Sequence, residues 1–326
     1  MSQTRKFDIT VAIPTYNGAR RLPAVLDRLQ EQIEMENIAW EVLVVDNNST
    51  DNLDEVVRGY QNTDFNRRVP IRYCKETQQG AAFARIRAIK EARGELVGFL
   101  DDDTLPALNW VRSAYFFGQE HPRAGAYGSQ IHGDYEIEPP ENFHRIASFF
   151  AIVERGDLPH LYQPQMKMLP PSAGLVVRRK AWLENVRDRP FLSGRSQQSI
   201  LNSEDLEAII QIQNSGWEIW YNPAMELAHQ ISRDRLTREY LLYLVRSTGL
   251  ARHHIRMLRY QSWQKPIFFP LGWVNDLRKA LIYFIKNRQL LEKDVIAACE
   301  MEFLRSTIVS PFYLWKLSLQ KKTNNQ

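Results

Sequence analysis

The chain has 326 residues, of which 44% are hydrophobic and 25% are charged, and its formal net charge is +4. A chain of this length and composition can bury a large core in one or two domains, which excludes an intrinsically disordered protein. The two cysteines, Cys74 and Cys299, are too few and too far apart for a disulfide framework, and they fit a reducing compartment.

The N-terminal part predicts a β-α-β unit. Residues 1–6 lead into an apolar run at residues 7–13 without the apolar core of a signal peptide, so we expect no export and a cytoplasmic location. Residues 7–13 and 40–45 are apolar enough for two buried strands. Between them, apolar residues recur at the spacing of a helix: Leu22, Val25, Leu26, Leu29 and Ile33.

The same alternation continues. A third strand is predicted at residues 69–74, an alanine-rich helix at 81–93 with Gly94 as its C-cap, and a fourth strand at 95–100. Alternating strands and helices predict an α/β fold, with a mostly parallel sheet covered by helices on both faces. Ligands bind such sheets at the carboxyl ends of the strands, and the polar motifs of this sequence fall at those ends.

The later part of the chain is less regular. We predict a strand at residues 174–178 and a helix from Glu204 to Gly216, and helices dominate after residue 235. The chain is therefore divided into an α/β domain at residues 1–235 and a mostly helical region at residues 236–326.

Three consecutive carboxylates, Asp101, Asp102 and Asp103, directly follow the fourth predicted strand. Like charges this close repel one another and cannot be buried unpaired, so the end of this strand requires a cation. Carboxylate oxygens suit Mg²⁺ or Mn²⁺, which fill their remaining positions with water and substrate phosphates. The triplet therefore indicates a metal ion and a phosphate-bearing substrate. The alternative interpretation is a solvated acidic loop.

The loops after the first two strands are rich in hydrogen-bonding groups. A carboxylate or amide there can accept a hydrogen bond from a nucleobase N–H or a ribose hydroxyl. Alternatively, the first loop is a simple turn, and Ser49 or Thr50 in the second loop is a helix N-cap. The residues concerned are Pro14, Thr15, Tyr16, Asn17, Asp46 and Asn48.

Together these motifs resemble the family 2 glycosyltransferases of the GT-A fold. The resemblance covers about residues 7 to 230, in family order and with family-like spacing. It implies a Rossmann-like GT-A domain, here followed by a C-terminal helical extension. Within the family, the chain is similar to the cyanobacterial hormogonium polysaccharide glycosyltransferase group. The matching positions are residues 13–17, 45–51, 80, 84–85, 94–95, 99–103, 204–205 and 229.

The resemblance implies a donor site. Asp46 would face the base, which is most often uracil in this family, so a UDP-sugar is expected. Arg85 would lie near the donor sugar and the diphosphate, and Asp102 near the ribose or the sugar. The asparagine that usually follows this arginine is replaced by Ile86. From the residues alone, Arg85 can also be an exposed charge on an alanine-rich helix. The nucleoside would contact Pro14, Thr15, Tyr16, Asn17, Asp46 and Asn48.

The resemblance also implies a metal site and a general base. Asp101 and Asp103 would form the DxD pair that holds Mn²⁺ or Mg²⁺, and His229 would complete the metal shell or contact the diphosphate. Asp205 would take the proton of the acceptor hydroxyl, with Glu204 beside it in the catalytic pair. We expect the helix N-terminus and the metal to lower the pKa of Asp205. From the residues alone, His229 can be structural, and the two acids can simply stabilise a helix N-terminus.

The expected function is the inverting, metal-dependent transfer of a sugar from a nucleotide-diphosphate sugar to a hydroxyl group. The acceptor would be a saccharide or a lipid-linked saccharide in polysaccharide biosynthesis. The alternatives are a nucleotidyltransferase and a degenerate nucleotide- or carbohydrate-binding protein without transferase activity. No glycine-rich phosphate loop follows the first strand, which disfavours the nucleotidyltransferase and excludes a dinucleotide-binding oxidoreductase.

The C-terminal region is basic. Residues 1–235 hold 27 basic and 32 acidic side chains, whereas residues 236–326 hold 15 basic and 6 acidic ones. Its apolar runs at residues 268–273 and 281–285 are too short to span a bilayer, which takes about 20 residues. We expect no nucleic acid but a peripheral contact with anionic lipid on the cytoplasmic face of the inner membrane. The alternatives are a helical cap on the core and a dimer contact.

Overall fold

The computed structural model describes residues 7–164, 168–194 and 200–323, with side chains described as far as residue 319. The predicted absence of a signal peptide concerns residues 1–6, which lie outside the described residues. The chain divides into two compact units. The first unit consists of Met1–Asp134, Ala151–Gln197 and Glu204–Gln230, and the second consists of Tyr135–Phe150, Gln198–Ser203 and Ile231–Gln326.

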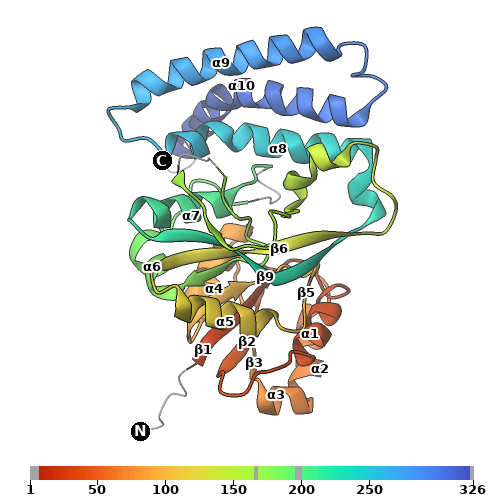
Figure 1. Ribbon diagram of the computed structural model, residues 1–326, viewed down its shortest axis with the longest axis vertical. Helices are drawn as coiled ribbons and strands as arrows, with labels where there is room; N and C mark the ends of the chain where they lie inside the picture. Colours follow the sequence, from red (N-terminus) through yellow and green to blue (C-terminus); the bar gives the residue numbers. More distant parts are fainter. Residues whose placement is uncertain (1–6, 165–167, 195–199, 324–326) are drawn as a thin grey trace. The chain divides into compact units, whose positions relative to one another are not determined.

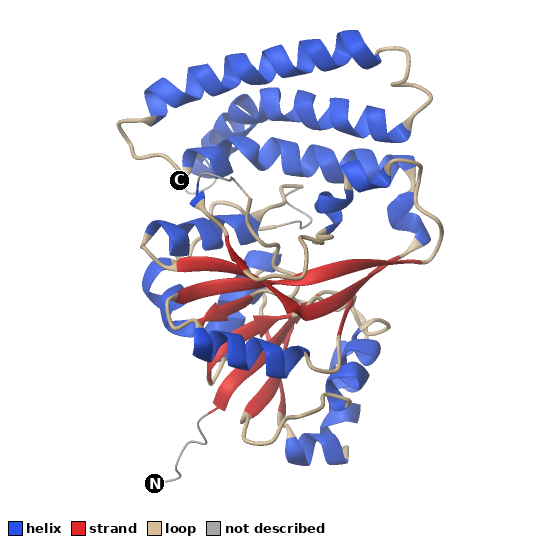
Figure 2. Cartoon of the chain, viewed as in Figure 1, coloured by secondary structure: helices blue, strands red, loops and turns tan. Residues whose placement is uncertain are grey.

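The first unit contains a parallel four-stranded half-sheet in the order β3-β2-β1-β4. Every residue of β2 is buried, as expected for a strand that is covered on both faces. Figure 2 shows the helices that flank this sheet, and α4 packs against β1 and β2. The strands are β1 (Phe7–Thr15), β2 (Trp40–Asp46), β3 (Ile71–Lys75) and β4 (Gly94–Phe99), and the helices are α1 (Leu22–Gln30), α2 (Leu53–Gln61), α3 (Asp64–Arg68), α4 (Ala81–Glu91) and α5 (Trp110–Glu120).

The other half of the sheet is mixed. β4 pairs with β8 in antiparallel orientation, β8 with β6 likewise, and β9 receives the short strands β5 and β7. The observed sheet confirms the predicted α/β fold with a mostly parallel sheet. The remaining elements of the first unit are β5 (Thr104–Pro106), β6 (Ala124–Tyr135), β7 (His160–Leu161), β8 (Val176–Arg178), α6 (Arg179–Asn185), α7 (Glu204–Asn214) and β9 (Glu218–Ile231). The 3-10 turns η1 (Phe143–Arg145), η2 (Ala147–Phe150) and η4 (Arg233–Leu236) belong to the second unit.

Two predicted element ends differ from the structure. The helix expected to reach residue 93 ends at Glu91, and Gly94 begins β4 instead of capping the helix. Gly94 is required there because a Cβ atom would lie 2.5 Å from the backbone nitrogen of Thr10. The first helix ends at Gln30, so Ile33 lies outside it and is exposed.

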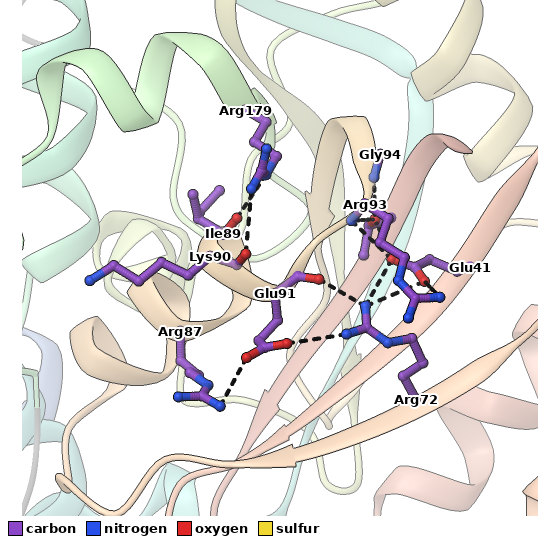
Figure 3. A network of polar contacts seen from close by, with 10 residues as sticks. Glu41, Arg72, Arg87, Ile89, Lys90, Glu91, Arg93, Gly94 and Arg179 are labelled. Atoms are coloured by element: carbon purple, nitrogen blue, oxygen red, sulfur yellow. Dashed lines mark hydrogen bonds and ion pairs between the residues drawn. The ribbon is translucent and has the colours of Figure 1, made fainter. Parts of the chain in front are cut away.

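A polar network stabilises the N-terminal ends of the parallel strands (Figure 3). Glu41 on β2 is fully buried and accepts hydrogen bonds from the Thr10 hydroxyl at 2.9 Å and the Arg93 backbone N–H at 3.1 Å. Arg72 on β3 donates to Glu41 at 3.3 Å and to the backbone oxygen of Glu91 on α4 at 2.8 Å. A buried carboxylate with these partners joins three strands and a helix.

The second unit is mostly helical, as predicted. It contains α8 (Arg238–Met257), α9 (Lys265–Asn287) and α10 (Val295–Thr323), and Figure 1 shows α10 lying between α8 and α9. Gly249 allows α8 and α10 to approach closely, because a Cβ atom there would lie 2.7 Å from the Cβ of Ser306. Within the described residues, every helix is too short or too polar to cross a membrane.

Candidate functional site at the carboxyl ends of the parallel strands

The loops after β1 and β2 are joined by Asn17. Its backbone N–H donates to the Ser49 hydroxyl at 3.0 Å, and its side-chain oxygen accepts the Thr50 backbone N–H at 2.8 Å. Asn17 itself has a positive φ of 50°, which asparagine tolerates better than most residues. Of the other predicted residues in this loop, Tyr16 is exposed and Pro14 is half-buried. The two predicted nucleoside loops therefore form one continuous surface.

Asp46 ends β2 and is buried. Its Oδ1 accepts the Ser49 backbone N–H at 2.7 Å, and its Oδ2 accepts the Tyr73 hydroxyl at 2.6 Å. Burial and the Asp46 carboxylate raise the pKa of Tyr73, so the hydroxyl remains a donor. Because a carboxylate has about four acceptor positions, Asp46 retains capacity for a further N–H donor.

Asn47 was missed by the sequence analysis, although it stands between the predicted residues Asp46 and Asn48. Its side chain is buried, accepts the Gly80 backbone N–H at 2.7 Å and donates to the Gln78 backbone oxygen at 2.8 Å. Asn47 therefore fixes the loop that precedes α4. Asn48 has a positive φ of 65°.

Asp102 is buried and holds the loop after β1. It accepts a hydrogen bond from the Thr15 hydroxyl. It also accepts hydrogen bonds from Nε of Arg21 at 2.8 Å and from Nη2 of Arg21 at 3.0 Å. The Asp102 hydrogen bond and charge raise the pKa of Arg21. The structure thus gives Asp102 and Thr15 a role in positioning the loops, and their predicted contact with the donor stays a prediction. No local sequence pattern indicated a role for Arg21, because its partner Asp102 lies 81 residues away in the sequence.

Arg85 on α4 is buried, which excludes the alternative of an exposed helix charge. It donates to Glu204 at 2.7 Å and lies 3.5 Å from Asp101. Burial alone would lower its pKa, but the surrounding carboxylates leave the pKa of Arg85 raised. Within the described residues, Arg85 Nε and Glu204 Oε2 are buried without a hydrogen-bond partner. Arg85 therefore links the acidic triplet after β4 to the start of α7.

Asp101 and Asp103 flank Asp102, and His229 on β9 approaches Asp103 to 3.4 Å. Burial raises the pKa of Asp101 to about 6; Arg85 opposes this shift and the Asp103 carboxylate adds to it. The triplet is not a fully solvated loop, since Asp102 and His229 are buried. Across residues 7–164, 168–194 and 200–323, no three His, Cys, Asp or Glu side chains come close enough to hold a metal ion by themselves.

The donor set nevertheless fits a divalent cation. Two carboxylates and an imidazole are oxygen and nitrogen ligands that Mn²⁺ and Mg²⁺ accept. Burial and the neighbouring Asp103 carboxylate raise the pKa of Asp101 although Arg85 opposes them, and a bound cation would favour the ionised carboxylate. A diphosphate would supply the remaining ligands.

Asp205 lies at the first turn of α7. Its Oδ2 accepts the Ser172 backbone N–H at 2.9 Å, and its Oδ1 accepts the Leu206 backbone N–H at 2.8 Å. The expected lowering of its pKa is wrong for the protein without metal: burial and the adjacent Glu204 raise the pKa of Asp205 despite these two hydrogen bonds. A small pocket between α4, α6 and α7 is lined in part by Arg85, Glu204 and Asp205.

Comparison with known proteins identifies related sequences and folds. Residues 10–182 match the sequence profile of the protein family Glycosyl transferase family 2. Glycosyltransferase AglE of Haloferax volcanii is 33% identical over 111 residues, which are 34% of this chain and 35% of AglE. The glucosyl-dolichyl phosphate glucuronosyltransferase of the same organism is 22% identical over 97% of this chain and 99% of its own length.

Among solved structures, the mannosyltransferase PcManGT from Pyrobaculum calidifontis, in complex with GDP-Man and Mn²⁺, has a TM-score of 0.59. It is 19% identical in sequence, and the match covers 96% of this chain and 88% of that chain. This similarity supports the GT-A-like fold.

Proposed function

The chain belongs to glycosyl transferase family 2, and from that premise we propose that it is an inverting enzyme of glycan biosynthesis. It moves a sugar from a nucleotide-diphosphate sugar to a hydroxyl of a saccharide or lipid-linked saccharide. The observation that carries the proposal is the contact of the buried Arg85 with both Asp101 and Glu204. This contact joins the acidic triplet to the catalytic pair, as a transfer between two substrates requires.

The donor nucleotide lies across the joined loops after β1 and β2. Asp46 accepts an N–H of the base through its remaining acceptor positions, while Tyr73 holds the carboxylate in place. Asn17 and Asn47 keep the two loops and the start of α4 in register with each other. Uracil is the base proposed from the family pattern. PcManGT was crystallised with GDP-Man, so guanine is the competing base for the test.

Arg85 and the acidic triplet bind the diphosphate end of the donor. A divalent cation held by Asp101, Asp103 and His229 would stabilise the negative charge of the departing nucleoside diphosphate. Arg85 supplies a fixed positive charge beside Asp101 and has one buried N–H still unpaired. Asp102 and Arg21 hold the triplet against the first loop.

Asp205 accepts the proton of the incoming hydroxyl. Its backbone hydrogen bonds to Ser172 and Leu206 fix the carboxylate, and its raised pKa makes it a stronger base than an exposed aspartate. The unpaired oxygen of Glu204 can accept a hydrogen bond from a second hydroxyl group of the acceptor saccharide. Because the base and the leaving group lie on opposite sides of the sugar carbon, the reaction inverts the anomeric configuration.

The acceptor remains defined only by class. One relative, which matches nearly the whole chain, is a glucosyl-dolichyl phosphate glucuronosyltransferase, and this supports a lipid-linked saccharide. Membership of the hormogonium polysaccharide group and a cytoplasmic location also stay predictions. A nucleotidyltransferase and a degenerate binding protein are the competing functions, and the experiment below separates them.

The test uses the full-length protein with UDP- and GDP-sugars, Mn²⁺ or Mg²⁺ and short saccharide or polyprenyl-linked acceptors. Mass spectrometry of the glycosylated product and release of nucleoside diphosphate are measured. We expect Asp205→Asn to lower kcat by about 10²- to 10⁴-fold, since general-base catalysis contributes that much, while nucleotide affinity is retained. The control is Asp157→Asn, which changes an exposed acid outside the candidate site. It should leave kcat unchanged.

Four outcomes would contradict the proposal. Release of pyrophosphate would indicate a nucleotidyltransferase. Binding of nucleotide without product under every condition would indicate a degenerate binding protein. Full activity of Asp205→Asn would rule out the assigned base, and a product that keeps the donor's anomeric configuration would rule out the proposed inversion.

A further inference from the structure

The outer side of α9 carries a row of large apolar side chains that the fold leaves exposed. These residues lie three, four or seven positions apart, a spacing that places them along one side of the helix. We call them the outer stripe. They are Ile267, Leu271, Val274, Leu281 and Ile285, with exposed fractions of 52%, 63%, 59%, 61% and 63%.

The opposite side of α9 is fixed by specific contacts. Trp273 donates from its indole N–H to the backbone oxygen of Ile308 on α10 at 3.0 Å. The Tyr283 hydroxyl donates to Glu300 on α10 at 2.7 Å. Asp276 is buried and pairs with Arg256 on α8 at 2.7 Å. Turning the outer stripe inward would break these contacts, so its exposure is a property of the folded unit.

The exposed charged side chains of α9 are all positive. Within Lys265–Asn287, Asp276 is the one acidic residue, and it is buried and paired. The exposed charged residues of α9 are Arg278, Lys279 and Lys286, and Arg278 occupies the gap in the outer stripe between Val274 and Leu281. The solvent-facing side of this helix is therefore apolar and cationic.

This combination selects among the possible partners. A symmetric contact between two copies of the chain would place the same patch on both sides, so Arg278, Lys279 and Lys286 would face like charges with no exposed acid of α9 to compensate. An anionic lipid surface offers both an apolar layer and negative headgroups. Long basic side chains can reach those headgroups while their stems stay in the apolar layer.

We propose that α9 lies in the plane of an anionic bilayer, with the outer stripe inserted at the level of the headgroups and upper acyl chains. Arg278, Lys279 and Lys286 bind the lipid phosphates. Exposed Trp263, two residues before the start of α9, adds an aromatic side chain of the kind that favours membrane interfaces. The proposal concerns the second unit alone and does not depend on the proposed sugar transfer.

The experiment is vesicle flotation of the full-length protein, with vesicles of phosphatidylcholine alone or mixed with phosphatidylglycerol. We expect flotation with the anionic vesicles and little with the neutral ones. A stripe variant carrying Leu271→Ser, Leu281→Ser and Ile285→Ser should lose at least about tenfold in partitioning, because binding scales with the apolar area inserted. A charge variant carrying Arg278→Gln and Lys279→Gln should lose about fivefold for each cation removed.

The matched control replaces three exposed apolar residues of the first unit, Ile33→Ser, Leu158→Ser and Leu183→Ser. It should partition like the unsubstituted protein. Circular dichroism melts show whether each variant is folded. The charge variant changes exposed side chains only, so it keeps the test valid if the stripe variant unfolds. Nucleotide affinity of all variants in solution is measured separately and should not change.

Equal flotation of the stripe variant and the unsubstituted protein would overturn the proposal. It would also be overturned if the unsubstituted protein were a dimer that ignores vesicles and the stripe variant were a monomer. Light scattering after gel filtration distinguishes that case, which would make the outer stripe a contact between copies of the chain.

Discussion

Gly18 lies in the first loop, beside the contact between Thr15 and Asp102. A Cβ atom there would overlap the Thr15 hydroxyl and the Asp102 carboxylate. Asp102 has little freedom to move, because Arg21 holds it with two hydrogen bonds. A side chain at position 18 would therefore push directly against Thr15 and Asp102.

We expect Gly18→Ala to lower the free energy of unfolding by about 1–3 kcal/mol, the usual cost of overpacking, and to weaken nucleotide binding. Urea unfolding and nucleotide titration measure the two effects. The control is Gly59→Ala on α2, where an added methyl meets nothing within 4 Å. There the helix should gain up to about 1 kcal/mol. Equal behaviour of the two variants would refute the close contact.

The raised pKa of Asp205 predicts the acid side of the pH–rate profile. A general base acts in its deprotonated form, so kcat falls as the pH drops through the pKa of Asp205. Because burial and Glu204 raise that pKa, the fall should lie above the ordinary aspartate value of 3.8. Glu204→Gln removes the adjacent negative charge and should shift the fall to lower pH. An unchanged profile in this variant would argue against Asp205 as the titrating group.

The residue types at the site were more predictable than their contacts. Asp46, Asp101, Asp103 and Asp205 stand out because they directly follow apolar runs or lie at the start of a predicted helix. Their partners Tyr73 and Ser172 were not predictable, since each meets its carboxylate across 27 or 33 residues of chain. The first pairing depends on the register of β2 against β3, and the second on how the loop before β8 meets the start of α7; no local pattern encodes either.

At the scale of elements, the Glu41 network is the clearest stabilising feature of the half-sheet. We expect Glu41→Ala to lower the free energy of unfolding by about 3 kcal/mol, because it leaves Arg72 and the Thr10 hydroxyl without their shared acceptor. The urea midpoint reports this loss. Glu36→Ala, at an exposed position in the turn before β2, should change the free energy by less than about 0.5 kcal/mol. A loss no larger than that of Glu36→Ala would show that the network contributes nothing.

The parallel strands were predicted well and the long strands were not. Strands buried on both faces are continuous apolar runs, which the sequence displays at β1, β2 and β4. β6 instead begins with small residues, and a Cβ at Gly125 would lie 2.6 Å from the Cβ of Trp217. Close packing requires glycine at that position, and glycine weakens the hydrophobic alternation by which a strand is recognised.

At the scale of the molecule, the composition of the second unit was only partly predictable. Charge and periodicity indicated a helical C-terminal region, but η1 and η2, about 90 residues earlier in the chain, belong to the same unit. Arg145, for example, pairs with Glu300 on α10. Deleting the C-terminal helices would therefore strip α8 of its partner α10, so substitutions at exposed positions are the better probe of what α9 contacts.

The Glu41 network and the residues proposed for chemistry occupy opposite termini of the same parallel strands. Four residues separate Thr10 from Thr15 along β1, and four buried residues separate Glu41 from Asp46 along β2. A lineage adapting to heat or cold could therefore alter one terminus without disturbing the other, so that thermal tolerance and substrate choice could evolve along separate routes.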